Sequence, residues 1–429
     1  MNLRLIRFNR LCELLVGLAL ATGIIFFVVV KSPSLDRVKQ VKYRHRIMTS
    51  SDLGQHIAFY ERRTRTNPDG ALDIALLASL YVQQAKSTGD ATWFGKASQA
   101  AKKSLRLLPM SNVPAKSVLA SVAAAEHRFE DAIRLSQEVL TFQPQSVGAR
   151  VTLTSSYLAL GDLNQASIQA DQLVDSRRNL EAFAWRGLVL AAQGRDQEAV
   201  HDLNRAISAE DLGEVQESAW VRSVLARLYL RRGKVEEAKE LLSEALRISP
   251  GYHLALSLMG ELEAEDGHYP LAEKYYQDAF RSSKQLAYLV GYAGVKSMSG
   301  QAGSARELLN EVEKMTRDEL KSGNIGHRLE LAKILLDRDG AAAAQEGLSL
   351  ARQEWALRKN VETRYVLSKA LMKNSFWSDA RNEIQSVLRT GVLDREYFRL
   401  ASVIERGLQD PQRSEFYFKM ALNEGPAFD

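Results

Sequence analysis

Cysteine and proline are scarce in this 429-residue chain, which has one cysteine, Cys12, and nine prolines. A single cysteine excludes an intramolecular disulfide and any zinc site that needs several cysteines. Few prolines, together with 26 glycines, argue against a collagen-like or disordered chain. Hydrophobic residues make up 45% and charged residues 25%, so we expect most of the chain to fold. Its length suffices for two or three ordinary domains.

Sequence motifs for catalysis and for metal binding are also missing. None of the seven histidines forms H-E-x-x-H or another histidine pair four residues apart. The glycine pairs Gly291/Gly294 and Gly300/Gly303 lack the G-K-[ST] ending of a phosphate loop, and no G-x-S-x-G sequence is present. We therefore expect no enzymatic activity, no metal site and no cofactor.

Positive charge is concentrated in the first part of the chain. Residues 1–65 hold 12 Lys/Arg and 4 Asp/Glu, whereas residues 66–429 hold 45 Lys/Arg and 48 Asp/Glu. The net charge is thus +8 before residue 66 and −3 after it. The larger part lacks the basic surface that phosphate backbones require, so we expect no nucleic-acid partner.

One long apolar run lies in the basic part, at Leu11–Val30, and Glu13 is its only charged residue. Its 17 uncharged residues from Leu14 approach the length that crosses a bilayer, which predicts an uncleaved transmembrane anchor. A signal peptide cleaved after Ala19-Leu20-Ala21 and a buried soluble helix are the alternatives.

The flanks of this run divide the N-terminal part into three predicted segments. These are a basic tail at 1–10, the anchor at 11–30 and a basic juxtamembrane segment at 31–70. Three arginines precede the run and six Lys/Arg follow it up to Arg46, so the positive-inside rule favours a cytoplasmic C-terminal domain. The expected localisation is a single-pass protein of a bacterial-type inner membrane or its equivalent. Residues 11–46 would contact membrane lipid, unless the basic run is only a solvated flank.

Beyond residue 70 the sequence repeats every 33–34 residues. Gly233 to Gly267 is 34 residues, and so is Ala238 to Ala272. One longer interval, 39 residues from Gly194 to Gly233, contains extra residues in the acidic stretch 209–218. Such a period predicts a stack of small supersecondary units, because a single unit cannot bury its own apolar face.

Each unit reads as two helices joined by a turn. Ala238, Leu242 and Ala245 share one face of the second helix, and the small alanines allow close helix packing. Gly233 would end the first helix in a left-handed conformation, and Pro250 would end the second.

The best unit reads Leu225-Ala226-x2-Tyr229, then Ala238-x3-Leu242, then Pro250, and it resembles the tetratricopeptide repeat family. The resemblance is strongest over 147–313 and weaker elsewhere, as around Gly340. It implies an all-α, right-handed α-solenoid of about ten helix pairs over 71–429, behind the N-terminal transmembrane helix.

The resemblance also implies that partner proteins bind along a concave groove lined by the first helix of each pair. The family's lining positions fall here on seven candidate residues: Ser155, Leu188, Trp220, Arg227, Arg231, Glu261 and Glu265. Some family members clamp a chaperone carboxylate with Lys and Asn, but the ninth positions here include no Asn. Two alternatives remain open. Arg227 could simply pair with Glu261, and Trp220 could pack under the 209–218 stretch.

These observations together predict a membrane-tethered scaffold for protein–protein interaction that assists assembly or quality control of a membrane or envelope complex. One alternative is an envelope transport or biogenesis component with the solenoid on the outer side of the membrane. Another is an enzyme or regulator whose site carries no recognisable motif.

Overall fold

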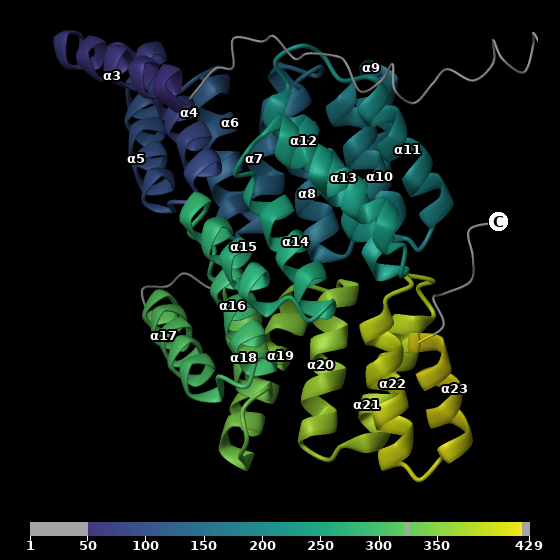
Figure 1. Ribbon diagram of the computed structural model, residues 1–429. Coiled ribbons are helices and arrows are strands. Elements are labelled where there is room, and N and C mark those ends of the chain that lie inside the picture. Colours follow the sequence, from purple (N-terminus) through teal and green to yellow (C-terminus); the bar gives the residue numbers. More distant parts are fainter. Residues whose placement is uncertain (1–49, 322–326, 423–429) are drawn as a thin grey trace, which may run out of the picture. The chain divides into compact units, whose positions relative to one another are not determined.

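The computed structural model describes residues 50–321 and 327–422, and within them the chain forms 21 α-helices and no strand (Figure 1). The expectation of an all-helical solenoid like that of tetratricopeptide repeats is therefore confirmed for this part of the chain. Helix α3 (Ser50–Thr66) comes first and ten helix pairs follow it.

The first helices of the ten pairs are α4 (Ala71–Thr88), α6 (Val113–Ala125), α8 (Val147–Leu160), α10 (Leu180–Ala192), α12 (Val215–Arg231), α14 (His253–Glu265), α16 (Leu286–Met298), α18 (Arg328–Leu336), α20 (Val361–Lys373) and α22 (Arg395–Gly407). The second helices are α5 (Thr92–Leu107), α7 (Phe129–Phe142), α9 (Leu163–Ser176), α11 (Asp196–Ser208), α13 (Val235–Ile248), α15 (Tyr269–Ser282), α17 (Ala302–Lys321), α19 (Ala341–Leu357), α21 (Trp377–Leu388) and α23 (Pro411–Leu422).

A residue with positive φ lies in the turn of every pair. Seven of the ten are glycines, including Gly233 with φ of 73°, as predicted. Glycine suits this turn because it lacks the Cβ atom that makes a left-handed backbone unfavourable. The other three are His127, Ser375 and Gln409, which adopt the same conformation without that freedom.

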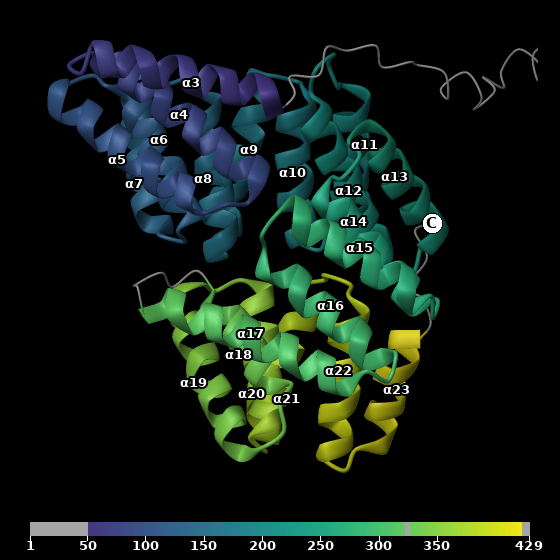
Figure 2. The same cartoon turned by 60° about the vertical axis from the view of Figure 1, so that its left-hand side comes forward.

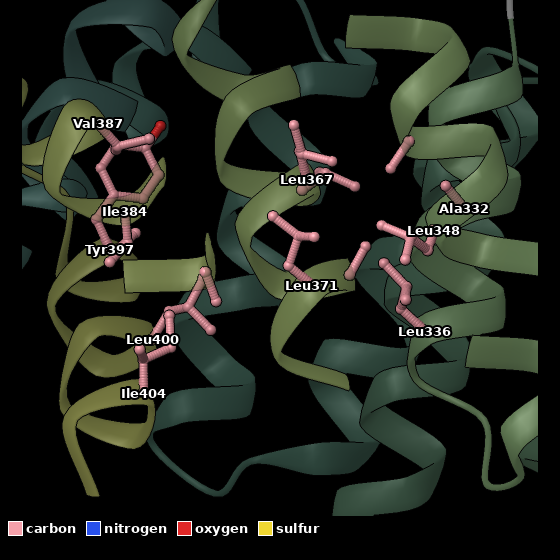
Figure 3. Close-up of a cluster of buried hydrophobic side chains, with 14 of the residues drawn as sticks. Ala332, Leu336, Leu348, Leu367, Leu371, Ile384, Val387, Tyr397, Leu400 and Ile404 are labelled. Atoms are coloured by element: carbon pink, nitrogen blue, oxygen red, sulfur yellow. The ribbon is translucent and has the colours of Figure 1, made fainter. Parts of the chain in front are cut away.

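Small residues fill the crossings between helices, also as predicted. Ala238, Ala245, Ala272 and Ala279 are fully inaccessible to solvent. Larger apolar side chains complete the core, and Figure 3 shows one cluster in which α18, α20, α21 and α22 contribute Leu336, Leu371, Ile384 and Ile404.

The first helices lie on the inner side of the stack. From α4 to α16 each first helix contacts the first helix of the next pair, and contacts of this kind also join α18, α20 and α22. Figure 2 shows the pairs α18–α19 and α20–α21 side by side in this way. The second helices do not contact one another to the same extent, so the first helices form the tighter, inner curve.

Helix α3 lies inside the segment 31–70 that the sequence analysis treats as a basic linker. Ile57 of α3 is buried against α4, and the Tyr81 hydroxyl donates to Glu61 at 2.9 Å. An ion pair between Arg63 and Asp73, at 2.7 Å, joins the same two helices. Packing of the helical stack therefore includes α3.

The extra residues at 209–218 supply the partners of a buried cation. Arg222 of α12 is only 2% exposed, and its Nη1 atom donates to Glu210 at 2.7 Å and to the Ser218 hydroxyl at 2.6 Å. Glu244 lies 3.2 Å from the same guanidinium. A buried arginine needs such partners, and the longer connection provides two of them.

The structure corrects the expected membrane localisation. Among residues 50–321 and 327–422, no helix combines the length and the apolar character needed to cross a bilayer. The physical reason is amphipathicity: even α17, the longest helix with 20 residues, carries charged side chains along its length. The expectation of a single-pass membrane protein is therefore wrong for the part of the chain described. The apolar run Leu11–Val30 and its basic flanks up to residue 49 lie outside the described residues.

Candidate functional site

Two stretches of chain about six units apart meet on the inner side of the stack. The Lys359 amide donates to the Leu160 carbonyl at 2.8 Å, and the Asn360 side-chain amide donates to the Ala159 carbonyl at 2.7 Å, across 201 positions in the sequence. The turn after α8 thus lies against the loop before α20 (Figure 1). One unit further along, Gly194 lies against Thr390 and Gly391. We call these two contacts, of Gly161 with Lys359–Asn360 and of Gly194 with Thr390–Gly391, the seam.

Glycine is required at the seam for a second reason besides its φ. A Cβ atom on Gly161 would lie 2.5 Å from the backbone of Lys359, and one on Gly194 would lie 2.5 Å from the Thr390 carbonyl oxygen. At the equivalent turns of later units, Gly267 and Gly300, a Cβ atom would have no neighbour within 4 Å. The repeat therefore demands a left-handed residue at each turn, while the seam also demands the absence of a side chain.

A cavity of about 320 Å³ lies beside the seam. Most of its wall is apolar, and the large apolar side chains come from both sides: Leu158, Leu163 and Leu188 from α8–α10, and Val361, Val392 and Tyr397 from α20–α22. We call it the seam cavity. Of the candidate groove residues, Leu188 and Arg231 line it.

Four charged side chains line the seam cavity: Arg231, Lys359, Glu362 and Arg364. Arg231 pairs with Asp394 at 3.2 Å, Arg364 with Glu383 at 3.6 Å, and Glu362 with Lys333 at 2.6 Å. Lys359 is exposed and makes no salt bridge within the described residues. Its ammonium lies 4.5 Å from the centre of the Trp355 ring, at the same distance as the Arg364 guanidinium. The cavity therefore has an excess of positive charge.

Two shifted pKa values reflect this positive potential. Burial by itself would raise the pKa of Glu362, but Lys333, Arg358 and Arg231 outweigh it and hold that pKa below its ordinary value. Burial lowers the pKa of the Arg227 guanidinium, and repulsion from Arg231 lowers it further. Neighbouring cations thus explain the lowered pKa of Glu362, and burial with one neighbouring cation explains that of Arg227.

The pair between Arg227 and Glu261, which the sequence left open as an alternative, does not form. Arg227 makes no salt bridge within the described residues, while its neighbour Arg231 pairs with Asp394 at the start of α22. Glu265 lies 3.8 Å from Arg395, also of α22. Arg231 and Glu265 thus find their partners in α22 and its N-cap, several units away.

Glu261 instead lies in a negative part of the inner surface. Part of this side chain is open to solvent, yet the surrounding protein raises the pKa of its carboxyl, and Glu265 and Asp394 raise it further. The inner surface therefore has an acidic region around Glu261 next to the basic region around Arg231.

The other two candidate residues lie away from the seam cavity. Trp220 is half-buried, and its ring packs on that of Trp185, with the ring centres 5.5 Å apart. Ser155 is half-buried and donates to the Thr152 carbonyl of its own helix at 3.0 Å. The first contact joins α10 to α12, and the second lies within α8.

Sequence reasoning missed one group of possible metal ligands. Glu263, Asp266 and His268, at the turn between α14 and α15, bring their ligand atoms within 4.8 Å of one another. The His268 Nδ1 atom lies 2.8 Å from a Glu263 carboxylate oxygen, so these two side chains form a local hydrogen bond. Their spacing matches none of the common metal motifs.

His127, in the turn between α6 and α7, is a further residue that sequence reasoning did not single out. Its φ is 59°, and its Nδ1 atom is buried without a hydrogen-bond partner in the described part of the chain. Burial lowers the pKa of His127 to about 4, and Arg358 and His327 add to the effect. This turn therefore lies near the same C-terminal units as the seam.

We expect His127 to make the protein less stable in acid. Because its pKa is lower in the folded state, the unfolded chain binds more protons between about pH 6.5 and pH 4. The free energy of unfolding should thus be retained above pH 6.5 and fall by about 3 kcal/mol as the pH drops to 4. Urea denaturation at several pH values measures it. His127→Asn, which tolerates the left-handed turn, should lose this part of the pH dependence; an unchanged profile would contradict the assignment.

Comparison with known proteins finds similarity to one repeat family. Two family profiles, both described as tetratricopeptide repeat, match residues 152–214 and 190–262. The solved structure of Pseudomonas aeruginosa pilF is similar with a TM-score of 0.38 and 20% identity, covering 47% of this chain and 91% of that chain. The two profile matches support tetratricopeptide repeats over residues 152–262, and such repeats generally bind other proteins.

Two curated proteins are similar over part of their length. Cellulose synthase operon protein C of Pseudomonas fluorescens is 26% identical over 251 residues, 56% of this chain and 19% of that protein. Human protein O-mannosyl-transferase TMTC1 is 21% identical over 213 residues, 48% of this chain and 22% of that protein. The chain spans about a fifth of the length of these relatives.

Proposed function

We propose that this chain is a protein-interaction scaffold that binds a segment of a partner along the inner surface of its first helices. What supports the proposal is that Leu188 and Arg231 line the seam cavity, and that Arg231 and Glu265 lie near Asp394 and Arg395 of distant units. The charges there are only partly compensated, which favours recognition of a charged partner over a purely structural role.

Assembly or quality control of an envelope complex is the finer function that we propose for this scaffold. The similarity to Cellulose synthase operon protein C supports it, because the name of that protein places it in a cellulose synthase operon. The same similarity favours a second candidate, a component of envelope transport or biogenesis. An enzymatic role has less support, since the similarity to TMTC1 is lower, at 21% identity over 213 residues.

The test is co-purification of the tagged full chain from its own cells, quantified by mass spectrometry. Leu188→Asp with Arg227→Glu should reduce the yield of true partners by at least about tenfold, since a desolvated contact supplies most of the energy at such an interface. The matched control changes two outward cations on second helices, Arg247→Glu with Arg281→Glu, whose side chains are 66% and 74% exposed. Partners lost equally from both variants, or from neither, would contradict binding at the inner surface.

A further inference from the structure

The seam cavity has features that specify the chemistry of a partner. We propose that it binds an internal acidic segment of a partner protein, taking one bulky apolar side chain between its two walls and placing a neighbouring Asp or Glu carboxylate against Lys359. This inference rests on the proposed function and narrows it to one site and one kind of ligand.

The apolar walls indicate that one part of the ligand is a large apolar side chain. Leu158 and Leu188 face Val361, Val392 and Tyr397 around a volume of about 320 Å³. This volume is at the small end for ligand sites, so it suits one large side chain and is too small for a helix. Burial of an aromatic or branched side chain between such walls is the usual source of affinity at a protein interface.

The charged side chains of the cavity indicate that the other part of the ligand is a carboxylate. Arg231, Arg364 and Glu362 at the cavity already have partners, at 3.2, 3.6 and 2.6 Å respectively. Lys359 has none within the described residues, so its ammonium is the cation left for a ligand. A lysine ammonium acts as a point charge, which suits one side-chain carboxylate. A terminal carboxylate is usually held by several converging donors, and the cavity offers only one uncompensated cation.

Binding at this site also depends on the seam. One wall belongs to α8–α10 and the other to α20–α22, and the two walls are held together by Lys359, Asn360 and the seam glycines. A ligand that contacts both walls binds the closed seam better than an open one. It must therefore favour closure, and opening the seam must weaken binding.

Ligand-observed NMR titration of the full chain with two short peptides tests the inference. Ac-Phe-Asp-NH2 and Ac-Phe-Asn-NH2 have the same shape and differ in one charge. We expect a Kd of about 1 mM for the Asp peptide, as for other ligands of this size, and about tenfold weaker binding of the Asn peptide. Lys359→Gln should abolish the preference for Asp, whereas Lys103→Gln, an exposed lysine of α5, should preserve it.

Glycine variants and a ligand with a terminal carboxylate test the role of the seam and the kind of carboxylate that binds. Gly194→Ala should raise the Kd of both peptides at least about fivefold. Gly267→Ala introduces the same backbone strain but no seam contact, so it should leave both Kd values unchanged. Three results would each overturn the inference. The two peptides could bind equally, or the preference for Asp could survive Lys359→Gln. The third is that N-acetylphenylalanine, which carries a terminal carboxylate, binds more tightly than the Asp peptide. If the peptides fail while Leu188→Asp with Arg227→Glu still loses partners, the proposed function stands and only this site is wrong.

Discussion

Replacing Gly161 or Gly194 by alanine is expected to lower the free energy of unfolding by about 2–4 kcal/mol, against about 1 kcal/mol for the same change at Gly267 or Gly300. All four glycines have φ between 72° and 85°, so the left-handed backbone accounts for the smaller, shared part. Only at the seam would the new methyl group also lie 2.5 Å from backbone atoms. Urea denaturation of the four variants measures the difference.

Hydrogen exchange at the Lys359 amide gives a local readout of the same contact. In the wild type this amide donates to the Leu160 carbonyl, so it should exchange slowly. Gly161→Ala should remove its protection, and Gly300→Ala should leave it intact. Equal losses of stability in all four variants, or fast exchange of Lys359 in the wild type, would show that the seam does not hold in solution.

A closed seam changes what the inner surface can bind. In an open solenoid the first helices offer a continuous groove, and any extended segment can enter from the side. Here the loops before α20 and α22 lie against the turns after α8 and α10, so part of that surface becomes the wall of a cavity. A partner must therefore enter the cavity with a side chain or separate the two stretches of chain.

The helix pairs and their turns could be predicted from the sequence because they depend on local chemistry. Gly233 and Pro250 mark the ends of two helices, and Ala238 and Ala272 mark a crossing that only small residues allow. Each of these signals recurs every 33–34 residues, which identifies the repeat even where single units are degenerate. The bounds and the order of the helix pairs can therefore be predicted without knowing how the stack curves.

The seam could not be predicted, because it depends on how the small rotation between units accumulates over about six of them. Asn360 illustrates the difficulty. Its side-chain oxygen accepts from the Thr363 amide at 2.9 Å, as an ordinary helix N-cap does, and this role alone explains the residue in the sequence. Its contact with Ala159 uses the remaining amide group and leaves no local signature.

The same limit applies to the candidate site. The repeat positions select Leu188 and Arg231, and both line the seam cavity. They could not show that Arg231 pairs with Asp394 from five units later, because only the nearer pair of Arg227 and Glu261 can be considered along the sequence. Lys359 lies in a loop, outside every lining position of the repeat, and only the tertiary structure brings it to the cavity.

Buried charge is the other property that periodicity does not reveal, and it sets the largest stability effect that we expect. Glu405 of α22 is 1% exposed and forms a salt bridge with Arg381 of α21, whose side chain is 27% exposed. At 1% exposure the carboxylate of Glu405 is almost completely withdrawn from water. Without its partner this carboxylate would be a buried, uncompensated charge.

Arg381→Met should therefore lower the free energy of unfolding by about 3–5 kcal/mol, whereas Glu405→Leu should cost only about 1 kcal/mol, because the freed arginine reaches water. The double variant should resemble Glu405→Leu, since removing both charges leaves none buried. Arg399→Met, which breaks an exposed pair with Glu396 on the same helix, should change stability by less than about 1 kcal/mol. Urea denaturation of the four variants measures the cycle. If Arg381→Met were no more harmful than Glu405→Leu, the carboxylate of Glu405 would have to be solvated, and the packing of α22 against α21 would differ from that described.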